Sequence, residues 1–110
     1  MTVIKCISPV DGSVYAERET MPLAAAQEAV ARAKKAQKAW ARRPLEDRIQ
    51  LVLKGVARVN EMADDIVPEI AWQMGRPVRY GGEFKGFNER SNYVAEIAGS
   101  SLAPIVIENS

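Results

Sequence analysis

The sequence predicts an α-rich α/β chain, with an N-terminal β-hairpin, about four helices and a terminal strand. Three observations favour this class. β-branched residues at the start lead into a turn that contains proline and glycine. Apolar residues then recur at spacings of three and four, which is typical of amphipathic helices. A second β-prone run comes close to the end of the chain.

The hairpin is expected to have strands at residues 2–7 and 13–17, joined by a turn at residues 8–12. Pro9 suits the second position of a turn, because its ring fixes φ near the required value. Gly12 relieves the backbone where the turn closes. The pattern therefore predicts two short antiparallel strands.

Two long helices are expected next, at residues 22–41 and from residue 45 to about Asn60. Pro22 marks the start of the first helix, where the missing N–H of proline costs nothing. Pro44 restarts the chain before the second helix. The two predicted apolar faces consist of Leu23, Ala26, Val30, Ala33, Ala36 and Trp40, and of Leu45, Ile49, Val52, Leu53, Val56 and Val59.

A third, shorter helix is expected from residue 64 or 65 to Met74, with Gly75 as its C-cap. Pro68 fits this helix only if the helix starts late. A proline in the interior would kink the helix at about 3 kcal/mol or more.

A fourth helix is expected from residue 78 or 82 to Ala98, with Gly99 as its cap. The β-prone run at residues 102–107 follows it. A strand here has no partner in the sequence except the small hairpin, and unpaired apolar edges are a liability. We therefore expect either that the fold continues beyond Ser110 or that the run closes against the hairpin.

Composition and charge give no nucleic-acid or membrane signature. Hydrophobic residues make up 47% and charged residues 26% of the 110 residues, which is typical of a globular protein. The 15 basic and 14 acidic residues nearly cancel, so we expect neither nucleic acid nor a membrane as partner. No apolar run reaches the ~18 residues of a membrane span. The single cysteine indicates a reducing compartment, and we expect a cytoplasmic protein.

No catalytic constellation is apparent. The sequence contains no histidine, which removes Ser-His and Cys-His arrangements and leaves no plausible metal site. Cys6 lies in a predicted strand and is interpreted as a small buried residue rather than a nucleophile. The glycines of residues 75–82 lack the spacing of phosphate-binding loops and are interpreted as cap and break residues. We therefore expect no catalytic, cofactor-binding or metal-binding residue.

Three other clusters have both a structural and a functional interpretation. The acidic pairs at residues 46–47 and 64–65 could share acid and base roles, but both lie where helix N-termini favour acids. The segment 22–43 has six basic residues and one acid, which could meet phosphates but is interpreted as a solvated face. An aromatic face on the fourth helix could line an apolar pocket, although core packing is favoured. It consists of Tyr80, Phe84 and Phe87.

Five strings, in their order and spacing, resemble the N-terminal region of NAD(P)-dependent aldehyde dehydrogenases. Ser8–Val14 is similar to the family's opening Asn-Pro-x-Asp/Thr-Gly turn, with Ser8 in place of the usual Asn. Ala36–Trp40 is similar to the end of the family's first long helix. The others are Pro44–Arg48 at the next helix start, Gln73–Pro77 in place of a Glu-x-Gly-Lys-Pro string, and the aromatic-rich Tyr93–Ala95.

This resemblance covers about residues 7–100 and implies a larger Rossmann-like aldehyde dehydrogenase fold. Residues 1–110 would be the N-terminal part of its cofactor-binding domain, an incomplete domain. Such enzymes oxidise an aldehyde to a carboxylic acid with NAD or NADP. A catalytic Cys, an Asn at the oxyanion and a Glu base carry the reaction. All three, and the cofactor loop, come later in the family, so the chain alone is expected to be inactive and to bind no cofactor.

The family's fourth helix can also line the tunnel through which the aldehyde arrives. On this sequence the resemblance implies a substrate tunnel beside Lys85, Phe87, Asn88 and Glu89. The implied partners are the remainder of the enzyme or homologous subunits, and a small aldehyde.

Two other interpretations stay open. A stand-alone helical interaction module would explain the lack of chemistry but not the orphan strand. A nucleic-acid-binding protein that uses the helix at residues 22–43 is disfavoured by the near-zero net charge.

Overall fold

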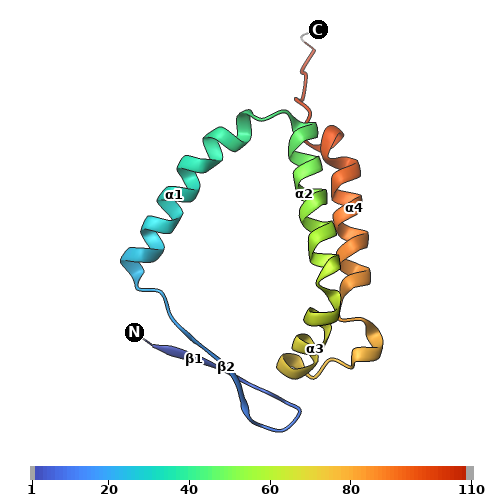
Figure 1. Cartoon of the computed structure of the whole chain (residues 1–110). Coiled ribbons are helices and arrows are strands. Elements are labelled where there is room, and N and C mark those ends of the chain that lie inside the picture. The colour runs from blue at the N-terminus through green and yellow to red at the C-terminus, as the bar shows by residue number, and fades with distance from the viewer. Residues whose placement is uncertain (1, 109–110) are drawn as a thin grey trace.

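A computed structural model describes residues 2–108, which form a two-stranded hairpin followed by a chain of helices (Figure 1). Strand β1 (Val3–Ile7) pairs antiparallel with β2 (Val14–Glu19), and Cys6 lies opposite Ala16. The register shifts after Cys6, and Gly12 closes the turn with a φ of 76°. The predicted hairpin is confirmed, although its second strand runs two residues further than expected.

The two long helices are also confirmed. Helix α1 (Leu23–Arg42) follows Pro22, and α2 (Leu45–Glu61) follows Pro44. Each proline lies at the N-cap, where the helix needs no N–H donor. Asn60 does not end α2 but lies in its last turn, where its side-chain amide donates to the carbonyl of Val56 over 2.8 Å.

Helix α3 (Ala63–Met74) starts earlier than predicted, because the carbonyl of Met62 accepts hydrogen bonds from the amides of Asp65 and Ile66. Pro68 therefore lies inside the helix, which is the alternative to the late start that would have accommodated it. Pro68 and Asp64, whose carbonyl loses its helical donor, are both exposed, so water can satisfy that carbonyl. Gly75 ends the helix in the left-handed conformation, as predicted.

Residues 78–101 do not form a single helix. A short 3-10 turn, η1 (Val78–Tyr80), is separated from α4 (Phe84–Ser101) by a break at residues 81–83. All three residues of the break have positive φ, including the non-glycine Glu83 at 72°. The expected cap at Gly99 is wrong, because α4 runs through this glycine to Ser101, and the amide of Leu102 still donates to the carbonyl of Ala98.

The predicted terminal strand is wrong for the part of the chain that the structure describes. Ile105, Val106 and Ile107 form no strand and are 93%, 81% and 83% exposed. The sheet contains β1 and β2 alone, and Figure 1 shows the C-terminal run at the opposite end of the molecule from the hairpin. A β-prone sequence becomes a strand only with pairing and packing partners, and none lies near this run.

The helices leave an open arrangement. Helices α2 and α4 lie side by side and antiparallel, with α3 and the hairpin at one end (Figure 1). Helix α1 stands apart from this pair. The radius of gyration is 19.6 Å, against about 13 Å for a compact domain of this length. No apolar side chain among the described residues is buried, so the structure contains amphipathic elements but no closed core.

Candidate functional site

The four residues that the family resemblance implies at a substrate tunnel lie in the first two turns of α4. The structure does not bring them together around one cavity. Phe87 lies edge-on to Phe84, with ring centroids 6.4 Å apart, and Asn88 is half-buried. Lys85 and Glu89 are exposed. The role of these four side chains at a substrate tunnel stays a prediction.

Asn88 instead joins α4 to α2. Its carboxamide oxygen accepts from Nδ2 of Asn60 over 2.7 Å, and its own Nδ2 donates to Oδ1 of Asn60 over 2.8 Å. Asn60 also donates to the carbonyl of Val56. The reciprocal pair fixes the register of α4 against α2, which the sequence analysis did not anticipate for either residue.

Phe87 and Phe84 border a small apolar pocket of about 160 Å³ between the start of α4 and the α2–α3 junction. Tyr80, grouped with them in the sequence analysis, does not share their face. It belongs to η1, where the guanidinium of Arg79 stacks 4.9 Å from the centre of its ring. The break at residues 81–83 changes the direction of the chain and separates it from the α4 aromatics. The other lining residues of the pocket are Val59, Ile66, Gly82 and Glu83.

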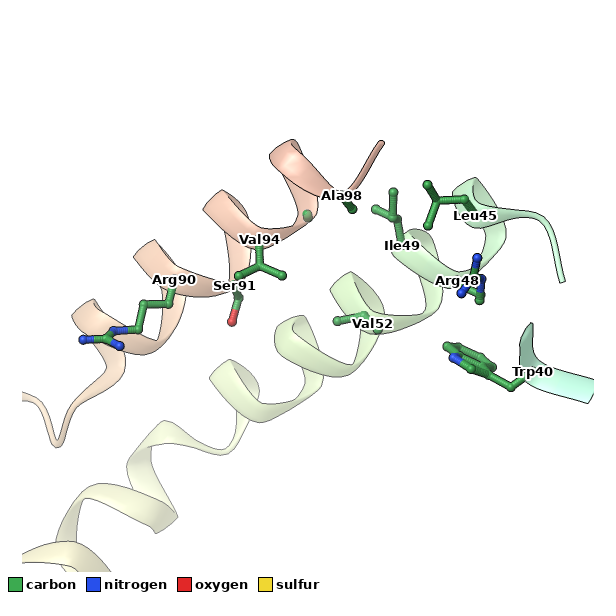
Figure 2. A pocket seen from close by; sticks show the side chains of 10 residues that line it. Trp40, Leu45, Arg48, Ile49, Val52, Arg90, Ser91, Val94 and Ala98 are labelled. Atoms are coloured by element: carbon green, nitrogen blue, oxygen red, sulfur yellow. The ribbon is translucent and has the colours of Figure 1, made fainter. Parts of the chain in front are cut away.

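A larger groove runs along the opposite end of the α2–α4 pair and has a volume of about 430 Å³ (Figure 2). Trp40, at the end of α1, closes one side of it. The groove is apolar apart from two arginines and a serine. Its lining consists of Trp40, Leu45, Arg48, Ile49, Val52, Arg90, Ser91, Val94, Ala95 and Ala98.

The two arginines of this groove differ in their surroundings. Nε of Arg48 is buried and has no hydrogen-bond partner among the described residues. Arg90 is exposed, and in Figure 2 its guanidinium points away from the other lining side chains. Nε of Arg48 is thus shielded from water and has no acceptor among the described residues.

The hairpin is anchored on the C-terminal half of α3 by residues that sequence reasoning missed. Ser8 is completely buried, and its hydroxyl donates to the carbonyl of Trp72 over 2.6 Å while accepting from the amide of Val10. Tyr15 stacks on Trp72 with the ring planes 5° apart. Hydrogen bonding with Glu69, followed by burial, raises the pKa of the Tyr15 phenol above its usual value of 10.0.

Cys6 belongs to the same anchor. It is half-buried rather than buried, and its thiol lies 4.0 Å from the carbonyl of Gln73. The acidic pairs at residues 46–47 and 64–65 lie in the first turns of α2 and α3, as the helix-terminus interpretation predicts.

The described residues do not fit a dinucleotide. Binding of a pyrophosphate in a Rossmann-like fold requires a parallel strand that leads through a glycine-rich loop into a helix. Here the strands form an antiparallel hairpin, and the helix after β2 begins at Leu23 without a glycine loop before it. Within residues 2–108, no group of three metal-ligating side chains gathers, and no helix is long and apolar enough to cross a membrane.

The structure thus consists of a hairpin and four helices, and no apolar side chain among residues 2–108 is buried. The model of the aldehyde dehydrogenase family matches residues 1–107, nearly the whole sequence. The chain therefore belongs to the aldehyde dehydrogenase family, an oxidoreductase family, as the sequence motifs indicated. No curated protein and no solved structure shows a significant match.

Proposed function

We propose that residues 1–110 form the N-terminal part of the cofactor-binding domain of a larger enzyme, which oxidises a small aldehyde to a carboxylic acid with NAD or NADP. The chain alone is inactive in this proposal, because the catalytic Cys, Glu and Asn belong to later parts of the family's sequence. The enzyme is cytoplasmic, and its partners are the remainder of the polypeptide and homologous subunits.

The observation that carries this proposal is that residues 2–108 form amphipathic helices and yet bury no apolar side chain. Burial of apolar surface contributes roughly 25 cal/mol per Å² and is the main favourable term in folding. Helix α1 leaves Leu23 and Val30 at 75% and 68% exposure, and α4 leaves Tyr93 and Val94 open in the same way. Faces of this kind become stable when other segments cover them.

The membership of the family supports the class of reaction, because the family match extends over almost every residue. The separate anchoring of the hairpin on α3 supports a scaffold role. It places Ser8 and Tyr15 in a packed junction, while the larger surfaces of α1, α2 and α4 stay available for contact.

The test has two parts. An antibody against residues 1–110 is expected to detect, in source cells, a protein several times heavier than 12.1 kDa. That protein, once purified, is expected to reduce NAD or NADP in the presence of an aldehyde, whereas the 110-residue chain is not. A native band at 12.1 kDa would instead favour a stand-alone helical interaction module. Turnover by the purified 110-residue chain would contradict the assignment of the chemistry to later residues.

A further inference from the structure

We propose that the groove between Trp40, α2 and α4 receives an apolar segment of the same enzyme that carries a carboxylate, and that this carboxylate pairs with Arg48. The inference rests on the proposed function, because it places the segment in the remainder of the polypeptide. It assigns Arg48 as a positioning residue for docking and gives it no part in the reaction.

The first argument is the state of the guanidinium. Nε of Arg48 is shielded from water and has no acceptor among the described residues. A buried charged donor without a partner is costly, and folded proteins almost always satisfy such groups. Arginine also stays protonated at any pH a protein experiences, so it cannot escape the cost by losing its proton. An acceptor from outside the described residues resolves this.

The second argument is the chemistry of the surrounding groove. Apart from Arg48, the end of the groove near Trp40 is lined by Leu45, Ile49 and Val52. In Figure 2, Trp40 and Arg48 lie together at this end, next to Leu45. A segment that covers these side chains must be apolar, and its one matching polar group must be an anion. A carboxylate accepts two parallel hydrogen bonds from a guanidinium, which is the strongest pairing in this setting.

The third argument separates this site from general surface charge. Arg90 also borders the groove, but it is exposed and points away from the lining side chains. An exposed arginine contributes little by pairing, since water already solvates it. The two arginines therefore form a matched pair: half-buried Arg48 has one shielded N–H without an acceptor among the described residues, and Arg90 is exposed.

We place the segment that fills the groove in the same polypeptide, because the groove is one of several exposed apolar surfaces of the structure. A transient ligand would leave the rest of the chain without a core, whereas a further segment of the enzyme covers Arg48 and the neighbouring apolar faces together. The alternative source is a second copy of the enzyme, and the experiment distinguishes the two.

The test uses the intact enzyme with the substitution Arg48→Lys, which retains a positive charge and introduces an amine that a carbodiimide can join to a carboxylate in contact. Mass spectrometry of the cross-linked peptides is expected to join Lys at this position to an acid outside residues 1–110 of the same subunit. Arg90→Lys is the control and is expected to give no such link. A link to an acid within residues 1–110, or equal linking from both variants, would overturn the proposal.

Mixing isotopically labelled and unlabelled enzyme before cross-linking separates the two sources. Links within one isotope support the segment of the same polypeptide, and mixed-isotope links would show a second copy and overturn the assignment. If Arg48→Lys does not fold, the wild-type enzyme provides the measurement. Phenylglyoxal is then expected to modify Arg90 but not Arg48. Rapid modification of Arg48 would contradict the proposal that a segment of the enzyme covers it. Aldehyde oxidation by the wild-type enzyme, measured in parallel, shows whether the proposed function itself has failed.

Discussion

The carboxamides of Asn60 and Asn88 satisfy one another across the interface between α2 and α4, with both hydrogen bonds between 2.7 and 2.8 Å. Each side chain is half-buried, so neither can turn to water without a change in the packing of the helices. This pair joins α2 to α4, which lie side by side and antiparallel. It gives Asn88 a structural task whether or not the same helix also borders a tunnel.

Removal of one member of this pair is expected to destabilise the enzyme that contains the segment. In Asn88→Ala, Oδ1 of Asn60 loses its donor and Nδ2 keeps only the carbonyl of Val56 as acceptor, which costs about 1–3 kcal/mol in the free energy of unfolding. Urea unfolding measures this cost, with Asn92→Ala on the exposed side of α4 as control. The double substitution at residues 60 and 88 is expected to cost less than the sum of the single changes, because the two act together. Strictly additive costs would show that the pair is not coupled in solution.

Sequence reasoning found these two asparagines but not their relationship. The sequence predicts that Asn60 ends a helix, and the family resemblance implies that Asn88 lies at a tunnel. Helical spacing assigns residues only to faces within one helix. The register between two helices depends on how their side chains interdigitate, which no spacing within either helix reveals. The prolines and Gly75 marked most helix ends correctly, because their backbone restrictions act locally.

The errors have physical causes of the same kind. Gly99 is a helix breaker by propensity alone, but the cost of about 1 kcal/mol is smaller than the gain from continuing α4. The β-prone run at residues 102–107 depends on partners that the hairpin does not provide. Ser8 looked like a departure from a motif, and its complete burial follows from a long-range contact with Trp72 that a sequence does not display.

Ser8→Ala is expected to loosen the hairpin from α3 by about 1–3 kcal/mol, because the amide of Val10 loses its acceptor and the carbonyl of Trp72 loses its donor. Hydrogen exchange of the β1 and β2 amides is expected to accelerate, while exchange in α4 stays unchanged. Ser13→Ala is the matched control, since its hydroxyl bonds only the exposed Asp11. Equal acceleration by the two substitutions would assign no special role to Ser8.

The isolated 110-residue chain is expected to behave as a set of helices without a fixed core. Its exposed apolar side chains are expected to bind a hydrophobic dye, and its helical signal is expected to fall gradually with urea rather than in one cooperative step. Circular dichroism and dye fluorescence measure both properties. A single sharp transition, with calorimetric and van't Hoff enthalpies that agree, would show that the chain folds alone and would favour a stand-alone module.

Tyr15 is expected to titrate above its usual pKa of 10.0, because its phenol is hydrogen-bonded with Glu69 in the folded state. A raised folded pKa means that this contribution to stability is fully present below the unfolded pKa and is lost as pH rises through the folded value. The difference in tyrosinate absorbance between the wild-type enzyme and Tyr15→Phe measures this pKa. Glu69→Ala is expected to return it toward the usual value, with Glu96→Ala as control. An unchanged titration after Glu69→Ala would exclude the hydrogen bond.

Alanine substitutions at Gly81 and Gly82 separate the cost of backbone strain from the cost of steric crowding at the break before α4. Both have positive φ, at 67° and 55°, but a Cβ at Gly81 would meet open space. At Gly82 it would lie 3.0 Å from Cγ2 and 3.3 Å from Cα of Val67, so the backbone of α3 would also have to move. Gly81→Ala is therefore expected to cost only the left-handed backbone penalty of about 1–2 kcal/mol.

Gly82→Ala is expected to cost clearly more than Gly81→Ala in urea unfolding of the enzyme, because overpacking adds about 1–3 kcal/mol to the backbone penalty. A second substitution, Val67→Ala, removes the contact with Cγ2 but leaves the contact with Cα, so it is expected to relieve only part of this excess. Full relief would show that side-chain crowding alone limits the site. Equal costs for the two glycine substitutions would mean that α3 and the break do not pack as closely in solution.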